Sequence, residues 1–455
     1  MTGKVLIEKV FAGEEVETIP WVPFAGVHAG KLKDFTAKEV LQDGDRLFAS
    51  LLEVNKIYRP DGMPVIFDLQ IEAETLGCEL KWAEDTPPTV SSHPLAEEDE
   101  IFDKIPKKNE GRIPMVISVM EKIKEEIGDE TALYGLICGP FTLASHLRGT
   151  NLFMDMITNP DYVIRLLEYT NKIAKTMAGY YIEAGMDLIA AVDPMVSQIS
   201  PDHLSQFLKK SYTGLFECIR ERGAISSFFV CGNAANNIEE MCLTEPDGIS
   251  VDENVSLAEA KSITDRYDLV IGGNIPLTTV MLLGNQQDNI KCVIDLIDEV
   301  KSSRNLIISP GCDMPYDVPL ENVIAVEQAV HETGQARKMI ENYEADKSGI
   351  EVELPDYENL DKPLIEVFTL DSDTCAACTY MMEAAYDAQK HFGDKIDLVE
   401  YKYTSPENIA RINRMGVPNL PSLYVNGKIK FRSIVPNRQE LFEVIEDAIS
   451  GKKAE

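Results

Sequence analysis

The chain has 455 residues, a length that suggests two or three domains, or one large barrel with a smaller module. Hydrophobic residues make up 44% of the sequence and charged residues 26%, so general disorder is excluded. The chain carries 43 basic and 76 acidic residues, which gives a formal net charge of −33. A surface this acidic repels phosphate groups, so we expect no nucleic acid and no membrane among its partners.

The cysteine usage and the N-terminus both bear on the expected compartment. The N-terminus lacks the long apolar stretch of a secretory signal, and no segment holds about 18 consecutive apolar residues. The nine cysteines are thinly spread and odd in number, unlike those of a secreted disulfide framework. Reduced thiols, metal ligands or a single redox pair fit better. We therefore expect a cytoplasmic protein, and the sequence does not indicate whether it forms an oligomer.

Short apolar runs alternate with longer helical patterns from position 21 to position 343. The runs read VPFAGVH, PVIFDL, LYGLICG, MDLIAAVD, ISSFFVCG, GISVDE, LVIGGNI and NLIISPGC. Such runs are typical of parallel strands buried on both faces, and helical patterns such as 202–222 and 319–343 separate them. Eight strand–helix units predict a (β/α)8 TIM barrel over residues 1–345. A doubly wound open sheet is the alternative, but no glycine-rich fingerprint follows the first run.

Three segments complete the predicted organisation. The stretch AEEDEIFDKIPKKNEGR, residues 96–112, is dense in charge, and we interpret it as a solvated crossover. Residues 346–362 read DKSGIEVELPDYENLDK, a polar and acidic segment that predicts a linker. Residues 363–455 then follow the order β-α-β-α-β-β-α, which suffices for one small α/β domain.

Polar and small residues end the apolar runs, and a barrel builds its active site where its strands end. Because turns need the same residue types, each position also has a purely structural interpretation. We predict Asp68 and His28 as catalytic residues. The predicted substrate- or cofactor-binding residues of the barrel are Glu72, Glu74, Gly139, Asp193, Asn233, Asp252 and Asn274.

Cys231 and Cys312 differ from the other cysteines of the barrel region. Each follows an apolar run and lies beside a glycine, in the stretches VCGN and PGCD. Thiolates are soft ligands that suit zinc, although a cysteine can also act as a small buried apolar residue. We assign Cys231 and Cys312 to function. The cysteines to which we give the apolar interpretation are Cys78, Cys218, Cys242 and Cys292.

Seven stretches between positions 64 and 325 carry a more specific signal. They read PVIFDLQIEAETLGCEL, CGPFTLASHLRG, DPMVSQISPDHLSQF, VCGNAANNIEEM, DGISVDENVSLAEAK, GGNIPLTTVMLLGN and SPGCDMPYDVPLENVIA. These stretches resemble the uroporphyrinogen decarboxylase superfamily, most of all its zinc- and corrinoid-dependent methyltransferase branch. The resemblance implies a (β/α)8 barrel and a methyl transfer between a small methylated donor or thiol acceptor and a corrinoid. The corrinoid would be carried by a separate protein.

The resemblance also implies a metal site, with one departure. Methyltransferases of this family bind zinc through a His-x-Cys pair and a later cysteine, which fall on Phe229, Cys231 and Cys312. Phenylalanine cannot bind a metal, so either zinc is lost or another residue replaces the histidine. We predict one zinc per chain with His28 as replacement ligand, or with an oxygen ligand from Glu253, Glu74 or Glu72. Cys231 and Cys312 follow the fifth and eighth runs, whose ends we expect to lie across the barrel from each other.

The C-terminal region carries a dithiol motif. Residues 374–379 read TCAACT, follow the apolar run LIEVFTLD and open a helical pattern. At a helix N-terminus the helix dipole and the free N–H groups stabilise a thiolate. Residues 363–455 resemble a thioredoxin- or glutaredoxin-like domain over nearly their full length. The resemblance implies that Cys375 attacks, that Cys378 resolves, and that Pro421 is the cis-proline beside the dithiol.

Several functions remain open at the level of the sequence. The main hypothesis is a zinc-assisted, corrinoid-dependent methyltransferase with a tethered thioredoxin-like module. The first alternative is a thiol-disulfide oxidoreductase in which Cys231 and Cys312 form a redox pair that Cys375 and Cys378 service. A tetrapyrrole decarboxylase and a non-catalytic module that binds a corrinoid protein are further alternatives. The decarboxylase is disfavoured, because the stretch FAGVHAGKLKDF lacks the arginines that bind carboxylates in decarboxylases of this superfamily.

Overall fold

The computed structural model describes residues 1–344, 352–373 and 375–451. The chain divides into two compact units, Met1–Ala345 and Asp346–Glu455, each with its own sheet. The predicted linker, 346–362, lies outside the described residues as far as position 351. None of the described helices combines the length and the apolar composition that crossing a membrane requires.

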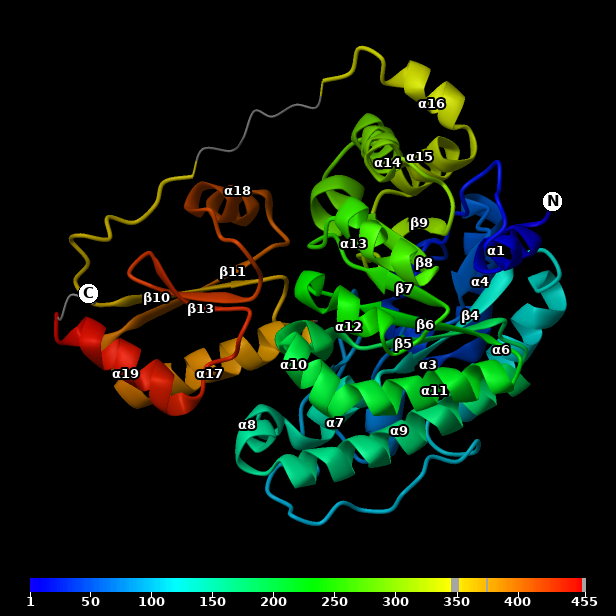
Figure 1. Ribbon diagram of the computed structural model, residues 1–455. Coiled ribbons are helices and arrows are strands. Elements are labelled where there is room, and N and C mark those ends of the chain that lie inside the picture. Colours follow the sequence, from blue (N-terminus) through cyan, green and yellow to red (C-terminus); the bar gives the residue numbers. More distant parts are fainter. Residues whose placement is uncertain (345–351, 374, 452–455) are drawn as a thin grey trace. The chain divides into compact units, whose positions relative to one another are not determined.

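The first unit is built on a curled, seven-stranded parallel sheet with the order β1-β4-β5-β6-β7-β8-β9 (Figure 1). Nearly every strand residue is buried, as the continuous apolar runs predict for a parallel sheet covered on both faces. The sheet is consistent with a TIM barrel. Its strands are β1 Gly62–Pro64, β4 Ala132–Cys138, β5 Leu188–Val192, β6 Ile225–Val230, β7 Gly248–Val251, β8 Val270–Ile275 and β9 Leu306–Pro310.

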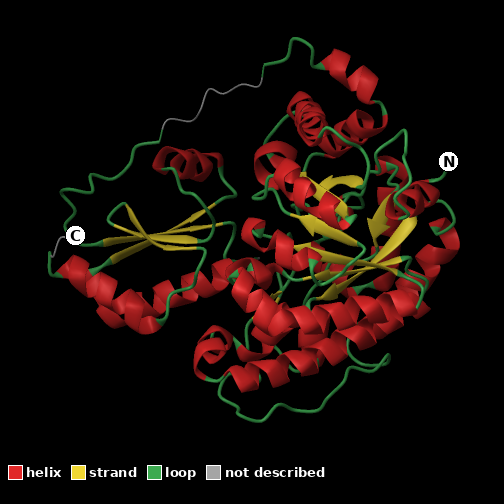
Figure 2. Cartoon of the chain, in the orientation of Figure 1, coloured by secondary structure: helices red, strands yellow, loops and turns green. Residues whose placement is uncertain are grey.

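Helices surround this sheet, and Figure 2 shows the strands of the first unit inside a helical layer. The long helices bury apolar residues at spacings of three and four, which is why they pack against the strands. The helices are α1 Gly3–Phe11, α2 His28–Lys31, α3 Ala37–Gln42, α4 Gly44–Tyr58, α5 Ile71–Thr75, α6 Ile113–Ile127, α7 Pro140–Arg148, α8 Asn151–Thr158, α9 Pro160–Glu183, α10 Pro201–His203, α11 Lys209–Glu221, α12 Ile238–Cys242, α13 Leu257–Thr264, α14 Gln286–Val300, α15 Leu320–His331 and α16 Thr333–Met339. A small antiparallel pair, β2 Leu80–Lys81 and β3 Thr89–Val90, stands apart.

The first predicted strand, VPFAGVH, does not form; the residue before it, Trp21, makes an isolated parallel bridge with Ile308. Pro20 and Pro23 flank this point and lack the N–H groups that a continuous ladder needs. The segment still bonds to both edges of the sheet. The Val22 amide donates to the Ile308 carbonyl at 3.0 Å, and the Asp61 amide, next to β1, donates to the Trp21 carbonyl at 2.9 Å. The segment thus ties β9 to β1, where an eighth strand would lie.

The second unit follows the predicted order β-α-β-α-β-β-α. Its sheet has the order β11-β10-β12-β13, in which β10 and β11 are parallel and the other pairs are antiparallel. The elements are β10 Leu364–Thr369, α17 Ala376–Phe392, β11 Asp397–Lys402, α18 Pro406–Met415, β12 Ser422–Val425, β13 Lys428–Arg432 and α19 Arg438–Ile449. Buried residues of β10, β12, α17 and α19 form one core.

The later part of the predicted linker belongs to this second unit. Arg411 donates to the carbonyl of Glu353 at 3.1 Å, and Arg414 donates to that of Val352. The Tyr357 hydroxyl donates to the Glu366 carboxylate at 3.0 Å. Within the described residues, the segment from 352 to 357 is therefore held against α18 and β10.

Candidate functional site

The sulfur atoms of Cys231 and Cys312 meet at the ends of β6 and β9, where they form a disulfide with a Cα–Cα distance of 6.1 Å. We expected these two ends to lie across the barrel from each other. At a glycine beside each cysteine, the loop packs closely against the loop that follows another strand of the sheet. Gly232 has φ +88°, and a Cβ there would lie 2.7 Å from the Ser197 hydroxyl; a Cβ on Gly311 would lie 2.8 Å from a backbone nitrogen of the β7 loop.

Phe229, which replaces the family histidine, is part of an aromatic cluster next to the disulfide. Its ring centroid lies 5.0 Å from that of Phe24 and 6.0 Å from that of Phe67. Cys231 and Cys312 pack, partly buried, against the apolar cluster that contains these rings. Where the family has a histidine that binds the metal, this chain has Phe229, whose ring packs with other apolar side chains beside the two cysteines.

His28, the first proposed replacement ligand, has both ring nitrogens engaged elsewhere. Nε2 lies 2.6 Å from the Tyr58 hydroxyl, and Nδ1 lies 2.9 Å from the Tyr316 carbonyl. Burial lowers the pKa of His28 to about 4, so the ring is neutral at physiological pH. His28 therefore links α2 to the loop after β9. Neither of its ring nitrogens is available to bind a metal together with Cys231 and Cys312.

Glu253, the second proposed ligand, lies in the loop after β7. Its Oε2 accepts a hydrogen bond from the Leu277 amide at 2.8 Å. Burial and the nearby Asp252 raise the pKa of Glu253 to about 8, so the carboxyl is protonated at neutral pH. The described residues contain no group of three or more His, Cys, Asp or Glu side chains placed to hold a metal ion. The residues as they are arranged do not fit the expected zinc site.

Three of the predicted binding residues stabilise loops at the strand ends. Asp252 accepts from the amide and side chain of Asn254 at 2.7 and 2.6 Å. The Asn274 side chain donates to the carbonyls of Asp252 and Val255 at 2.9 and 2.6 Å. Asn233 accepts from the Ala235 amide at 3.2 Å. The Asp252 and Asn233 contacts are local turn bonds, whereas Asn274 ties the end of β8 to the loop after β7.

A partly buried arginine, which the sequence did not single out, joins the carboxylates after β1. Arg112 donates to Asp68 at 2.5 Å and to Glu74 at 2.7 Å, and its side chain is 11% exposed. It is the last residue of the charge-rich stretch 96–112, which we interpreted as solvated. Asp68 also accepts from the Gln70 amide at 2.8 Å. Composition alone gave no signal that this one charge turns inward.

Glu72 lies beside this ion cluster and has one unused oxygen. Its Oε1 accepts from the Cys138 amide at the end of β4 at 3.1 Å. Its Oε2 is buried and has no hydrogen-bond partner among the described residues. Burial raises the pKa of Glu72 to about 7, with Asp68 adding to the shift. A carboxyl of this kind can accept or release a proton near neutral pH.

Asp193 and Gly139 form the joint between β5 and α7. Asp193 accepts from the amides of Phe141 and Thr142 at 2.9 and 3.0 Å, and from the Tyr212 hydroxyl. Gly139 lets this carboxylate approach, because a Cβ there would collide with it. Burial raises the pKa of Asp193 to about 6 despite these hydrogen bonds. In this arrangement Asp193 caps the first turn of α7.

Replacing Asp193 by alanine is expected to lower the free energy of unfolding by about 2–4 kcal/mol, because buried N–H and O–H donors lose their acceptor. Urea unfolding followed by tryptophan fluorescence measures this effect, since both tryptophans, Trp21 and Trp82, lie in the first unit. An unchanged unfolding midpoint would show that Asp193 does not hold α7.

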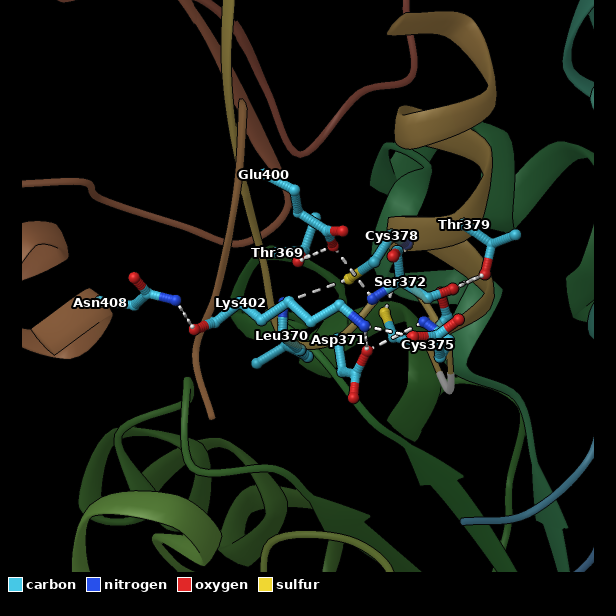
Figure 3. Close-up of polar contacts among 11 residues, drawn as sticks. Thr369, Leu370, Asp371, Ser372, Cys375, Cys378, Thr379, Glu400, Lys402 and Asn408 are labelled. Carbon is cyan, nitrogen blue, oxygen red and sulfur yellow. Dashed lines mark hydrogen bonds and ion pairs between the residues drawn. The ribbon is translucent and has the colours of Figure 1, made fainter. Parts of the chain in front are cut away.

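The dithiol of the second unit lies at the start of α17 (Figure 3). Cys375 is the N-cap residue, and its partly exposed sulfur accepts from the Cys378 amide at 3.3 Å. The Cys378 sulfur is buried and accepts from the Leu370 amide at 3.3 Å. Burial raises the pKa of Cys378 well above that of a free thiol. The two sulfurs therefore differ: one is reachable at a helix N-terminus and the other is buried behind it.

Charged and polar groups fix the loop that carries Cys375. Lys402 on β11 forms an ion pair with Asp371 at 2.7 Å (Figure 3). It forms a second ion pair with Asp373. The Thr369 hydroxyl donates to Glu400 at 2.6 Å. The peptide bond from Leu420 to Pro421 is cis, in the loop that leads into β12.

Comparison with known proteins finds relatives of two kinds for the first unit, Met1–Ala345, which we call the barrel unit. The methylcobamide:CoM methyltransferase MtbA of Methanosarcina acetivorans is 27% identical over 269 residues, which cover 58% of this chain and 77% of that protein. The methylcobamide:CoM methyltransferase MtaA of Methanosarcina barkeri is 27% identical over 300 residues, which cover 62% and 83%. A uroporphyrinogen decarboxylase of Nostoc punctiforme is 23% identical over 279 residues, 59% of this chain and 77% of that protein.

A solved structure of a methyltransferase from Methanosarcina mazei supports the fold. It aligns with a TM-score of 0.68 at 24% identity and covers 73% of this chain and 99% of its own. The profile of the uroporphyrinogen decarboxylase (URO-D) family matches residues 2–333, which is most of the chain and nearly all of the barrel unit. The chain therefore belongs to the uroporphyrinogen decarboxylase family.

Proposed function

We propose that the barrel unit is a methyltransferase that moves a methyl group between a corrinoid on a separate protein and a small thiol. The observation that supports this most is the similarity to proteins named methylcobamide:CoM methyltransferases, over 77–83% of their length. The absence of arginine from the stretch FAGVHAGKLKDF disfavours the decarboxylase alternative. The expected location is the cytoplasm.

The chain's own residues suggest how a thiol would be activated. Glu72 has a free, buried Oε2 and a pKa of about 7, so it can take the thiol proton near neutral pH. The thiolate would then attack the methyl carbon, so that the sulfur–carbon bond forms as the carbon–cobalt bond breaks and leaves its electron pair on cobalt. Arg112 would hold Asp68 and Glu74 in place beside Glu72. Since the residues do not fit zinc, no step is assigned to a metal.

The test mixes the reduced chain with methylcobalamin and 2-mercaptoethanesulfonate, a small thiol, and follows the absorbance of the cobalamin. We expect demethylation that is faster than without protein and saturates with thiol, with the methyl thioether as product. The test of Glu72 compares Glu72→Gln with a matched control, Glu126→Gln. Glu126 is exposed on α6, so its replacement should leave the rate unchanged. No methyl thioether from a folded, reduced chain, with this thiol and with others, would contradict the proposal.

For the second unit we propose a thioredoxin-like thiol-disulfide oxidoreductase. The supporting observation is the position of Cys375 at the N-terminus of α17, with Cys378 buried behind it. Cys375 would attack a disulfide as a thiolate, and Cys378 would then displace the product and close the dithiol into a disulfide. Reduction of dithiobis-nitrobenzoate, a small aromatic disulfide, by the dithiol of the full chain tests this proposal. Equal rates for the chain and its Cys375→Ser variant would contradict it.

A further inference from the structure

We propose that the disulfide between Cys231 and Cys312 is a redox-active site, and that its reductant is the Cys375–Cys378 dithiol of this same protein. The inference rests on the thiol-disulfide activity proposed for the second unit, and it names the substrate of that activity. It assigns a role to a cysteine pair at the barrel mouth that the methyl-transfer chemistry leaves unused.

The chemistry of the nine cysteines separates two pairs from the rest. Burial raises the pKa of Cys78, Cys242 and Cys292 to about 12, and also raises that of Cys138 well above its ordinary value, so these thiols stay protonated and unreactive. Cys218 is a single residue on α11 with no disulfide partner among the described cysteines. The remaining four form one disulfide and one CxxC dithiol.

The surroundings of the disulfide favour redox chemistry. Cys231 and Cys312 are each partly exposed residues, and exchange requires that an attacking thiolate reach one of their sulfurs. The aromatic rings of Phe24, Phe67 and Phe229 cover one side and offer no metal ligand. Cys231 and Cys312 pack against apolar side chains on one side, and no third ligand for a metal lies beside them among the described residues. This arrangement suits reversible oxidation better than metal binding.

The reaction balances as an exchange between two pairs. The Cys375 thiolate attacks one barrel sulfur, which forms a mixed disulfide and releases the other barrel cysteine as a thiolate that takes up a proton. Cys378 then gives up its proton and attacks Cys375, which forms the CxxC disulfide and releases the second barrel cysteine as a thiolate that takes up a proton. Two electrons move from the CxxC pair to the barrel pair. An external dithiol must reduce the CxxC disulfide again before the next cycle.

The covalent link between the two units gives the exchange a kinetic signature. Tethered groups react at an effective concentration that dilution does not change. If the exchange occurs within one chain, its rate constant is independent of protein concentration; if it occurs between two copies, the rate rises with concentration. Both results support the dithiol as the reductant, and they identify which copy supplies it.

The test starts from the full chain with both pairs oxidised and adds a limiting amount of dithiothreitol. Alkylation at successive times, followed by peptide mass spectrometry, measures how fast Cys231 and Cys312 become free. We expect reduction at least tenfold faster in the wild-type chain than in Cys375→Ser, and no change in the control Cys218→Ser. Equal rates in the wild-type chain and in Cys375→Ser would overturn the inference.

A second variant keeps the test decisive if Cys375→Ser folds poorly. In Cys378→Ser the first attack can occur but the second cannot, so a mixed disulfide between Cys375 and Cys231 or Cys312 should accumulate. Its absence, in a folded chain, would overturn the inference. Reduction of dithiobis-nitrobenzoate without reduction of the barrel pair would overturn only this inference, whereas failure to reduce either would overturn the activity proposed for the second unit as well.

Discussion

Replacing Asp61 by alanine is expected to lower the free energy of unfolding of the first unit by about 3–5 kcal/mol. The Oδ2 atom of Asp61 accepts from the Trp21 amide and faces His331 Nε2, each at 2.8 Å. The other ring nitrogen of His331 lies 2.9 Å from Glu327, which also pairs with Arg59. The substitution would leave the buried Trp21 amide without its acceptor and would remove one of the two carboxylates that face His331, where the N-terminal segment ties β9 to β1.

The stabilisation that His331 gains from Asp61 and Glu327 depends on pH in a defined direction. Burial alone would lower the pKa of His331, but the hydrogen bonds to Asp61 and Glu327 outweigh burial and raise it to about 9. The unfolded value is 6.5, so the stabilisation is fully present below pH 6.5 and is lost as the pH rises through 9. A shift of this size corresponds to about 3 kcal/mol.

Urea unfolding at pH 6 and pH 10, followed by tryptophan fluorescence, measures the unfolding free energy of the first unit, because the second unit contains no tryptophan. The difference in unfolding free energy between the wild-type chain and Asp61→Ala should shrink between the two pH values. Asp295→Ala removes an exposed pair with Lys291 on α14 and should change stability by less than about 0.5 kcal/mol. A loss no larger than this control would contradict the role assigned to Asp61.

Replacing Glu72 by glutamine is expected to lower the rate of methyl transfer to a thiol by about 10²–10⁴-fold. Glutamine keeps the shape of the side chain and can still accept from the Cys138 amide, but it cannot take a proton from a thiol. In the wild-type chain the rate should rise with pH through about 7, as the buried carboxyl loses its proton. In Glu72→Gln this rise should be absent.

Stability measurements separate the loss of chemistry from a loss of folding. The pKa of Glu72 rises from 4.5 to about 7 on folding, so its ionisation costs stability as the pH rises between these values, by about 3 kcal/mol. Glu72→Gln removes this cost, and the variant should unfold no more easily than the wild-type chain at pH 8. A folded variant with the wild-type rate and pH profile would contradict the role of Glu72 as proton acceptor.

Six of the eight predicted runs coincide with strands, β4 to β9, because continuous apolar runs leave a parallel strand few other structures to adopt. The run PVIFDL begins at Pro64, where β1 ends, so the second strand lies just before the predicted one. The first run departs from the prediction because prolines interrupt its hydrogen-bonding groups at positions 20 and 23. The predicted position of Cys375 at the start of a helix is confirmed, since the apolar run, the turn and the helical pattern lie next to each other in the sequence.

The contacts between distant segments could not be predicted from local patterns. Arg112 lies 44 residues after Asp68, and only the packing of the crossover decides that this one charge turns inward. Cys231 and Cys312 are separated by 81 residues, and the barrel topology alone suggested that their loops lie far apart. Each loop packs at a glycine against the loop after another strand of the sheet, and a single sequence does not reveal such packing.

The most direct test of the barrel-mouth site is to denature the purified, unreduced chain, alkylate its free thiols and locate the blocked cysteines by mass spectrometry, with zinc measured on the same sample. We predict that Cys231 and Cys312 remain joined until a reductant is added, and that zinc is well below one per chain. The contrary result is that both cysteines are alkylated without reductant and that the chain holds about one zinc, which is lost in Cys312→Ser. That result would contradict the disulfide and would support the zinc site predicted from the sequence.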